Sequence, residues 1–273
     1  MLVRHDSRGV LVIGQPSHAW ISGQLARAWG GERFGAVEPY EEVCLAAEQH
    51  DVGMAMWDLE PPRHMESGLP VSFLQMAIPD HIDLWTTAPR RLLRQSRYAA
   101  LLVSLHGTRL YGHRDLGALP AAERSLVLEF LESQRRLQHD LLESLRSDPK
   151  TAASAANPLV ARNSGLIGTW DGLSLALCLD YAPYTVTDVP TAGAPAELQL
   201  AETHHPGRLR LDPWPLRAES LTVRCEGQRL TATYGDDDAM HDALDARGKT
   251  LPARPAVLAL PRWYRLNTLV FAH

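Results

Sequence analysis

The sequence predicts a mainly α-helical fold with a small β-rich subdomain at the C-terminal end. Two patterns lead to this prediction. Most of the first 185 residues fall into long runs with apolar residues at helical spacing, separated by short segments containing proline or glycine. After about residue 186, short runs of alternating apolar and polar residues predominate, which is typical of strands. We therefore expect a helical part, residues 1–185, and a β-rich part, residues 186–273.

The chain begins with a short strand and two helices. Residues 9–14 (GVLVIG) form a compact apolar run of strand type. A helix follows that has Pro16 in its first turn and stops at Gly30. A second helix is expected over residues 38–58, because acidic residues occupy its first turn, where the helix dipole favours negative charge. This helix should end before Pro61, since proline cannot continue it.

Four more helices are expected before the pattern changes. The second of them is apolar almost all round and therefore buried, while the third is long and amphipathic. The fourth follows a linker of small residues and is again apolar. Their ranges are residues 78–95, 96–112, 119–148 and 165–182.

The β-rich part contains one predicted hairpin. Residues 221–234 alternate on both sides of a turn at Gly227, which predicts two paired strands. Residues 208–215 and 256–261 are further strand candidates, and residues 236–248 form a short helix between them.

Composition excludes several classes of function. There are 27 basic and 32 acidic residues, so the net charge of −5 offers no positive field for a nucleic-acid backbone. The three cysteines lie far apart, which is typical of reduced thiols in the cytoplasm. The N-terminal apolar run is flanked by charges on both sides, unlike a signal peptide, and no apolar run is long enough to cross a bilayer. We expect a cytoplasmic protein that acts on a small molecule, with no nucleic-acid or membrane partner; its oligomeric state is left open.

Histidines and aspartates predict a metal site. Four histidines occur in four separate predicted helices, one of them directly before an aspartate, and a second aspartate lies in a fifth helix; the residues are His18, His50, Asp51, His81, His106 and Asp171. Helices packed side by side can each project a ligand into a shared interior. Imidazole and carboxylate hold first-row divalent metals while leaving coordination positions open. Asp51 has two carboxylate oxygens and is placed to bridge two ions.

Each ligand candidate, taken alone, also has a structural explanation. These explanations are a half-exposed helix start for His18, a hydrogen-bonded pair for His50 and Asp51, a surface position for His81, a carbonyl-bonded core position for His106 and a helix cap for Asp171. The ordered set of six residues favours the metal site over five separate explanations.

This order of residues resembles the ligand series of the HD-domain superfamily in its dinuclear, six-ligand form. That form is found among HD-GYP phosphodiesterases, inositol oxygenase and the phosphonate-cleaving diiron oxygenases. Residues 50–53 (HDVG) match the H-D-x-G core of the motif, and residues 170–177 (WDGLSLAL) resemble its terminal aspartate helix. The whole chain, including residues 211–217 (LDPWPLR), also resembles a bacterial family of unknown function. The resemblance implies an HD-like helical bundle that binds one or two divalent transition-metal ions, iron, manganese, nickel or zinc.

The sequence departs from the superfamily at Met54. In many relatives, a lysine or histidine at this place contacts the anionic group of the substrate, whereas methionine carries no charge. Candidate replacements are Arg109, one turn after His106, and Arg114 or His113.

Three hypotheses for function follow. The first is a metal-dependent hydrolase of a phosphoester or related small molecule, a phosphohydrolase in which metal-bound hydroxide attacks phosphorus. The resemblance implies a primary ion on His18, His50, Asp51 and Asp171, and a second ion on His81 and His106. Arg109 or Arg114 would then neutralise the phosphate.

The second hypothesis is a mixed-valent diiron oxygenase on the same ligands. The third is a non-catalytic regulatory module with a structural metal, which predicts a closed site with no space beside the ions. Both catalytic hypotheses are compatible with the six-ligand set, and the frequency of hydrolases in the superfamily that the chain resembles favours hydrolysis.

Overall fold

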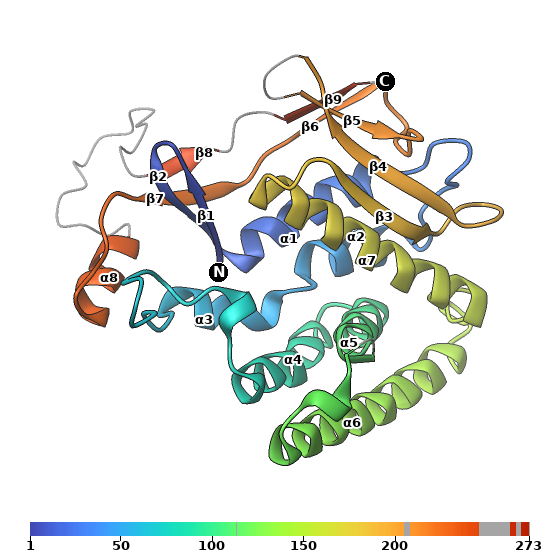
Figure 1. Cartoon of the computed structure of the whole chain (residues 1–273). Coiled ribbons are helices and arrows are strands. Elements are labelled where there is room, and N and C mark those ends of the chain that lie inside the picture. Colours follow the sequence, from blue (N-terminus) through green and yellow to red (C-terminus); the bar gives the residue numbers. More distant parts are fainter. Residues whose placement is uncertain (113, 205–207, 246–262, 266–268, 273) are drawn as a thin grey trace, which may run out of the picture.

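The computed structural model describes residues 1–112, 114–204, 208–245, 263–265 and 269–272. Within these ranges the chain is mainly α-helical with a β-rich C-terminal part, which confirms the predicted fold class. The helices are α1 (Gln15–Ala28), α2 (Tyr40–Gln49), α3 (Ala55–Leu59), α4 (Ile78–Leu92), α5 (Arg97–Gly112), α6 (Ala121–Arg146), α7 (Asn157–Leu179) and α8 (Asp237–Leu244). Figure 1 shows α4, α5 and α6 at one end of the molecule and the strands toward the other, with α1, α2 and α7 between them.

The helical core is built around α5 and α7. Helix α5 packs against α2, α4, α6 and α7, while α1 packs against α2 and α7. Trp29 at the end of α1 is fully buried and meets Trp170 of α7 edge to face, with 5.6 Å between the ring centroids. Apolar residues on every side of α5 and α7 are therefore explained by helices that have neighbours on every side. None of the described helices combines the length and apolar character needed to cross a membrane.

The prediction of a single helix over residues 38–58 is wrong, because the helix is interrupted after Gln49. Helix α2 ends at Gln49, and the chain resumes as a 3₁₀ turn (Val52–Met54) followed by α3. The motif glycine Gly53 explains the change of direction, because its backbone lies against Leu84 and Ala88 of α4, and an added Cβ would come within 3.0 Å of the Ala88 side chain. His50 and Asp51 consequently lie at the break between the two helices, where their side chains face the interior.

Strands from both ends of the chain form two sheets among the described residues. The strands are β1 (Leu2–Asp6), β2 (Gly9–Ile13), β3 (Tyr184–Val189), β4 (Ala196–Glu202), β5 (Arg208–Asp212), β6 (Ser220–Val223), β7 (Glu226–Leu230), β8 (Trp263–Arg265) and β9 (Leu269–Ala272). One sheet has the order β1-β2-β7-β8 and the other the order β3-β4-β5-β9-β6. The strand predicted at residues 9–14 is thus β2, and β1, which was not predicted, pairs with it.

The hairpin predicted at residues 221–234 is wrong. Strand β6 pairs with β9, whereas β7 pairs with β2 and β8, so the two strands belong to different sheets. Between them the chain passes through the buried Cys225 instead of turning back on itself. Alternation identified the strands but not their partners, because pairing depends on contacts far away in the sequence. The strand candidate at residues 256–261 lies outside the described residues.

Candidate metal centre

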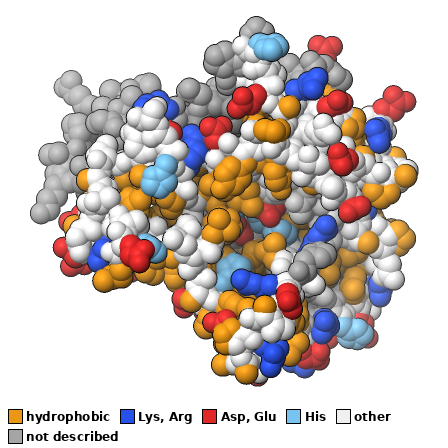
Figure 2. Space-filling model, in the orientation of Figure 1, with side chains coloured by type: hydrophobic (Ala, Val, Ile, Leu, Met, Phe, Trp, Pro, Cys, Tyr) orange, Lys and Arg blue, Asp and Glu red, His pale blue; other side chains and the backbone are white. Residues whose placement is uncertain are grey.

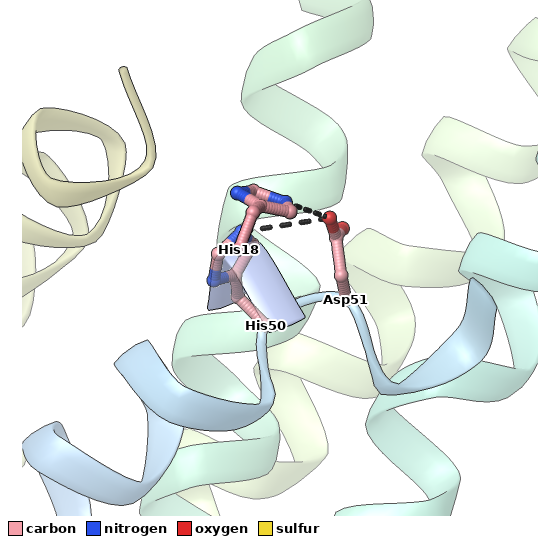
Figure 3. A group of neighbouring side chains, drawn as sticks. All are labelled: His18, His50 and Asp51. Atoms are coloured by element: carbon pink, nitrogen blue, oxygen red, sulfur yellow. Dashed lines mark hydrogen bonds and ion pairs between the residues drawn. The ribbon is translucent and has the colours of Figure 1, made fainter. Parts of the chain in front are cut away.

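Five of the six predicted ligands meet at one point in the interior. His18 comes from α1, His50 and Asp51 from the break after α2, His106 from α5 and Asp171 from α7. They form two groups that share His50, and within each group the potential ligand atoms lie within 4.8 Å of one another. Figure 3 shows the imidazoles of His18 and His50 beside the Asp51 carboxylate. His18, His50 and His106 are at most 2% exposed, so these histidines meet in the interior and not on the surface.

The spacing of the donor atoms suits a transition-metal ion. His50 Nε2 lies 3.3 Å from Asp171 Oδ1 and 3.7 Å from Asp51 Oδ2. His106 Nε2 lies 3.6 Å from Asp171 Oδ2. Two ligands that each lie about 2.0–2.1 Å from one ion are separated by roughly 3–3.5 Å. Small adjustments of the side chains therefore suffice to place these donors around an ion.

The main chain fixes which nitrogen of His50 faces the centre. His50 Nδ1 donates a hydrogen bond to the Ala47 carbonyl oxygen at 2.8 Å, within the last turn of α2. The Nε2 atom is buried and has no hydrogen-bond partner among the described residues. A buried polar atom without a partner is rare and costly. An imidazole held through one nitrogen, with the other directed at carboxylates, is the usual arrangement of a metal ligand.

Two serines hold His18 in the same way. Ser174 Oγ donates to the Asp171 carbonyl oxygen at 2.8 Å, so it can accept a hydrogen bond from His18 Nδ1 at 2.9 Å. Ser22 Oγ lies 3.0 Å from Ser174 Oγ, and both serines are fully buried. His18 Nε2 is thereby turned to Asp51 Oδ2, 2.6 Å away. Two acceptor lone pairs at that separation need a proton or a metal ion between them.

Opposite charges dominate the electrostatics of the ion-free centre. Burial disfavours the charged form of His50, but the carboxylates of Asp51 and Asp171 outweigh burial and raise the pKa of His50 to about 9. Burial would raise the pKa of Asp51, yet the imidazoles of His50 and His18 lower it overall. Burial lowers the pKa of His106 to about 4, with Asp171 opposing it only in part. The centre thus holds two ionised carboxylates and favours a cation between them.

His81, the sixth predicted ligand, lies beside the centre but outside both groups. Trp85 Nε1 donates to His81 Nε2 at 3.0 Å, so the ring proton must be on Nδ1, which donates to the Tyr111 hydroxyl at 2.6 Å. Both nitrogens are therefore engaged. Burial lowers the pKa of His81, which keeps the ring neutral. In this arrangement His81 is held within the protein, and a second ion would require it to release Trp85.

A cavity of about 220 Å³ adjoins the centre. His18, Asp51, His106 and Asp171 line its inner end, while apolar residues form most of its walls: Met54, Phe73, Leu74, Met76, Ile78, Trp85, Leu110 and Leu175. Figure 2 shows histidine side chains in a hollow near the middle of the face in view, with hydrophobic side chains and a cation beside them. The Asp171 side chain is 13% exposed and lines this cavity, so the centre can be reached through it.

The two candidate arginines are placed differently. Arg114 lines the cavity, and its guanidinium carbon lies 5.9 Å from the centroid of the Tyr111 ring. Arg109 instead lines a separate groove formed by α5, α6 and α7, and its guanidinium group lies beside Gly165 and Gly168 of α7. The third candidate cation, His113, lies outside the described residues. Met54 is buried in the cavity wall, where it adds no charge.

Three side chains of the site were not predicted from the sequence. Gln15 lines the cavity one helical turn before His18, and Ser174 lies one turn after Asp171. The i, i+3 spacing from a ligand candidate was a usable signal for both. Phe73 comes from a short 3₁₀ turn between α3 and α4, and its sequence gives no comparable signal.

Comparison with known proteins gives one family. A family model described as "Protein of unknown function (DUF3891)" matches residues 1–232. This range includes every ligand candidate and the strands up to β7. No curated protein and no solved structure matches the chain.

Proposed function

The chain belongs to the DUF3891 family, whose function is unknown, and from its metal centre we propose that it is a metal-dependent hydrolase of a small phosphoester or related molecule. One observation carries this proposal: the ligand cluster forms the inner end of a cavity that is open to solvent. A purely structural metal is normally enclosed by its ligands, whereas a catalytic one keeps an open position and room for a substrate. The resemblance of the ligand order to the HD-domain superfamily supports the same assignment.

The donor set fits one or two divalent ions of iron, manganese, nickel or zinc. His18, His50, His106, Asp51 and Asp171 would hold the first ion, and two carboxylates would balance its charge. A divalent ion bound by such ligands supplies activated water and polarises phosphoryl oxygens. Whether a second ion binds depends on His81, because its Nε2 atom already accepts from Trp85.

The remaining residues bind and orient the substrate. Arg114, which lines the cavity, faces the negative charge of a bound phosphate. Met54, Trp85 and Ile78 form apolar walls, which lower the local dielectric constant and strengthen the electrostatic interactions inside. Tyr111 keeps its proton at neutral pH, because burial raises its pKa to about 12, and it anchors His81 against α5.

A diiron oxygenase is the second candidate, and the wall of the cavity favours it. Met54 stands where a phosphate-binding cation would be expected, and most of the other wall residues are apolar. An apolar cavity suits a substrate in which a carbon centre reacts. Such an enzyme needs two irons, so it also needs His81 as a ligand.

Metal content and hydrolysis together decide between these functions. The purified protein should contain a stoichiometric divalent metal by elemental analysis and should release nitrophenol from small nitrophenyl phosphate esters. Both properties should be lost in His50→Ala and Asp51→Ala and retained in His139→Ala, because His139 is exposed on α6. Two irons per chain with an O₂-dependent spectral change and no ester hydrolysis would refute the hydrolase.

A further inference from the structure

Gln15 is a buried residue of the cavity lining whose side-chain oxygen has no hydrogen-bond partner among the described residues. It stands at the start of α1, is 2% exposed and lines the cavity together with His18. Its Oε1 atom is buried and makes no hydrogen bond to any described residue. Its backbone nitrogen, by contrast, donates to the Asp58 carboxylate, which fixes the start of the helix. A rigidly held backbone with an unsatisfied side-chain amide is expected where a ligand completes the hydrogen bonds.

The charges around the cavity favour a ligand that carries one negative charge. Asp51 and Asp171 together balance one divalent ion. Among the described residues that line the cavity, Arg114 is the only one with a lysine or arginine side chain. The cavity therefore has a net charge of about +1 with one ion bound. A triphosphate or a diphosphate would leave most of its charge uncompensated in apolar surroundings.

Size and wall chemistry restrict the body of the ligand. The cavity of about 220 Å³ is smaller than pockets for drug-sized ligands, which measure roughly 300–1,000 Å³. Phe73, Met76 and Ile78 contribute apolar surface on one side, and Trp85 and Leu175 line it as well. A nucleoside would have to place many polar atoms against these walls, whereas a compact aromatic or branched aliphatic group would not.

We infer that the cavity takes a small monoanion with a compact apolar body and a hydroxyl or amino group that donates to Gln15. Arg114 faces the negative charge, the apolar wall holds the body, and the Gln15 amide makes the site specific for the donor group. This inference rests on the proposed function only in taking the cavity as the place where the substrate meets the ion. Gln15 acts here as a specificity-determining residue.

Binding of stable probes tests the inference without requiring turnover. The first probe is methyl phenylphosphonate, a monoanion that the enzyme does not need to cleave, titrated calorimetrically into the metal-loaded full chain. It should bind at least tenfold more tightly than inorganic phosphate, adenosine monophosphate or the neutral dimethyl phenylphosphonate. Arg114→Gln should remove the preference for the monoanion over the neutral ester, while Arg124→Gln, at an exposed position on α6, should not.

The role of Gln15 is tested with hydroxylated probes. One of the three ring-hydroxylated isomers of methyl phenylphosphonate should bind roughly tenfold more tightly than the parent, the gain expected of one hydrogen bond to an otherwise unsatisfied group. In Gln15→Leu this gain should disappear, so that the parent probe and the hydroxylated probe bind with equal affinity. The melting temperature of Gln15→Leu should equal or exceed that of the parent protein, because leucine removes a buried polar atom that has no partner. This result would separate a loss of specificity from a loss of folding.

The outcomes separate the inference from the proposed function. Equal binding of phosphate, the nucleotide or the neutral ester would overturn the inference, even if the protein hydrolyses nitrophenyl esters. An unchanged preference for the hydroxylated probe in Gln15→Leu would overturn it as well. Probe selectivity as described, without hydrolysis of any ester, would leave the inference standing and refute the hydrolase.

Discussion

Ser174 shows how a single hydroxyl can organise the candidate centre without being one of the ligand candidates. It links the Asp171 backbone to the His18 ring, so it fixes the orientation of one ligand relative to the helix that carries another. Such supporting hydrogen bonds are typically worth 10- to 100-fold in metal affinity. The geometry of the candidate centre therefore also depends on residues that are not ligand candidates.

Replacing Ser174 with alanine should weaken metal binding by about 10- to 100-fold and leave the fold intact. The physical reason is that His18 loses the acceptor for its Nδ1 proton and becomes free to rotate. Competition with a chelating dye measures the effect. Ser133→Ala is the matched control, because Ser133 lies on α6 and bonds only to a carbonyl oxygen of its own helix. Equal metal affinity in the two variants would show that His18 needs no such support.

Metal binding should release at least one proton near neutral pH. The raised pKa of His50, about 9, means that His50 is protonated in the metal-free protein at pH 7, and the incoming ion must displace this proton. His106, with its pKa lowered to about 4, is already neutral and loses none. Apparent affinity should therefore rise at least tenfold per pH unit between pH 5 and pH 8, and level off above about pH 9.

Calorimetry in buffers of different ionisation enthalpy measures the protons released. Affinity that does not change with pH across this range would contradict the charged state of His50. The linkage has a second consequence for the metal-free protein. Because the pKa of His50 is raised on folding, its contribution to stability is fully present below about pH 6.5 and is lost as the pH rises through about 9.

The ligand candidates could be predicted from the sequence, but their hydrogen bonds could not. Five ligand candidates could be predicted because residue type and order reflect chemistry that the fold must serve. The engagement of His81 by Trp85 and Tyr111 could not, since it depends on side-chain rotamers in a packed interior. The same reason explains why Arg109 and Arg114 looked equivalent in the sequence and are not equivalent in space.

Among the secondary-structure elements, the break between α2 and α3 sets the positions of His50 and Asp51. A continuous helix would carry these neighbours about 100° apart around its axis. The break lets both side chains face the same interior point, and Gly53 permits it by allowing α4 to approach. Helices elsewhere could be predicted from periodicity, but this break could not, because it depends on a tertiary contact.

Gly53→Ala should destabilise the protein by about 1–3 kcal/mol and reduce metal binding. The added methyl group would collide with the Leu84 carbonyl oxygen, which as backbone cannot move aside cheaply. Urea unfolding followed by far-ultraviolet circular dichroism measures the change in the free energy of unfolding. Gly193→Ala provides the control, since nothing lies within 4 Å of a Cβ at that position. If both variants unfold at the same urea concentration, the close packing of the motif against α4 is not needed.

For the whole molecule, one core joins the helices to the C-terminal strands. Leu198, Leu200 and Leu211 are at most 2% exposed and belong to the same buried cluster as the helical core. The backbone nitrogens of Gly30 and Gly31 both bond to the Pro215 carbonyl oxygen, which ties the end of α1 to the strands. The division into residues 1–185 and 186–273 describes the change in the sequence pattern. We propose that the two parts fold together as one unit.

Removing residues 187–273 should therefore precipitate the helical part. The truncation deletes β7, the partner of β2, and uncovers apolar surface along α1 and α7. The soluble fraction after expression and the binding of a hydrophobic dye measure the effect, with the full chain as the reference. A soluble, monodisperse fragment with a cooperative melting transition would instead establish residues 1–186 as an independent domain.

The pairing of β2 with β7 also sets the order of events during synthesis. Strand β2 leads directly into the helix that carries Gln15 and His18, yet its partner residues, Gln228 to Leu230, come far later in the chain. The helix with the first ligand candidate is therefore synthesised long before the strand that supports it. We expect the proposed site to bind an ion only after β7 has been made, so cells starved of metal should accumulate ion-free chains in which this sheet is already formed.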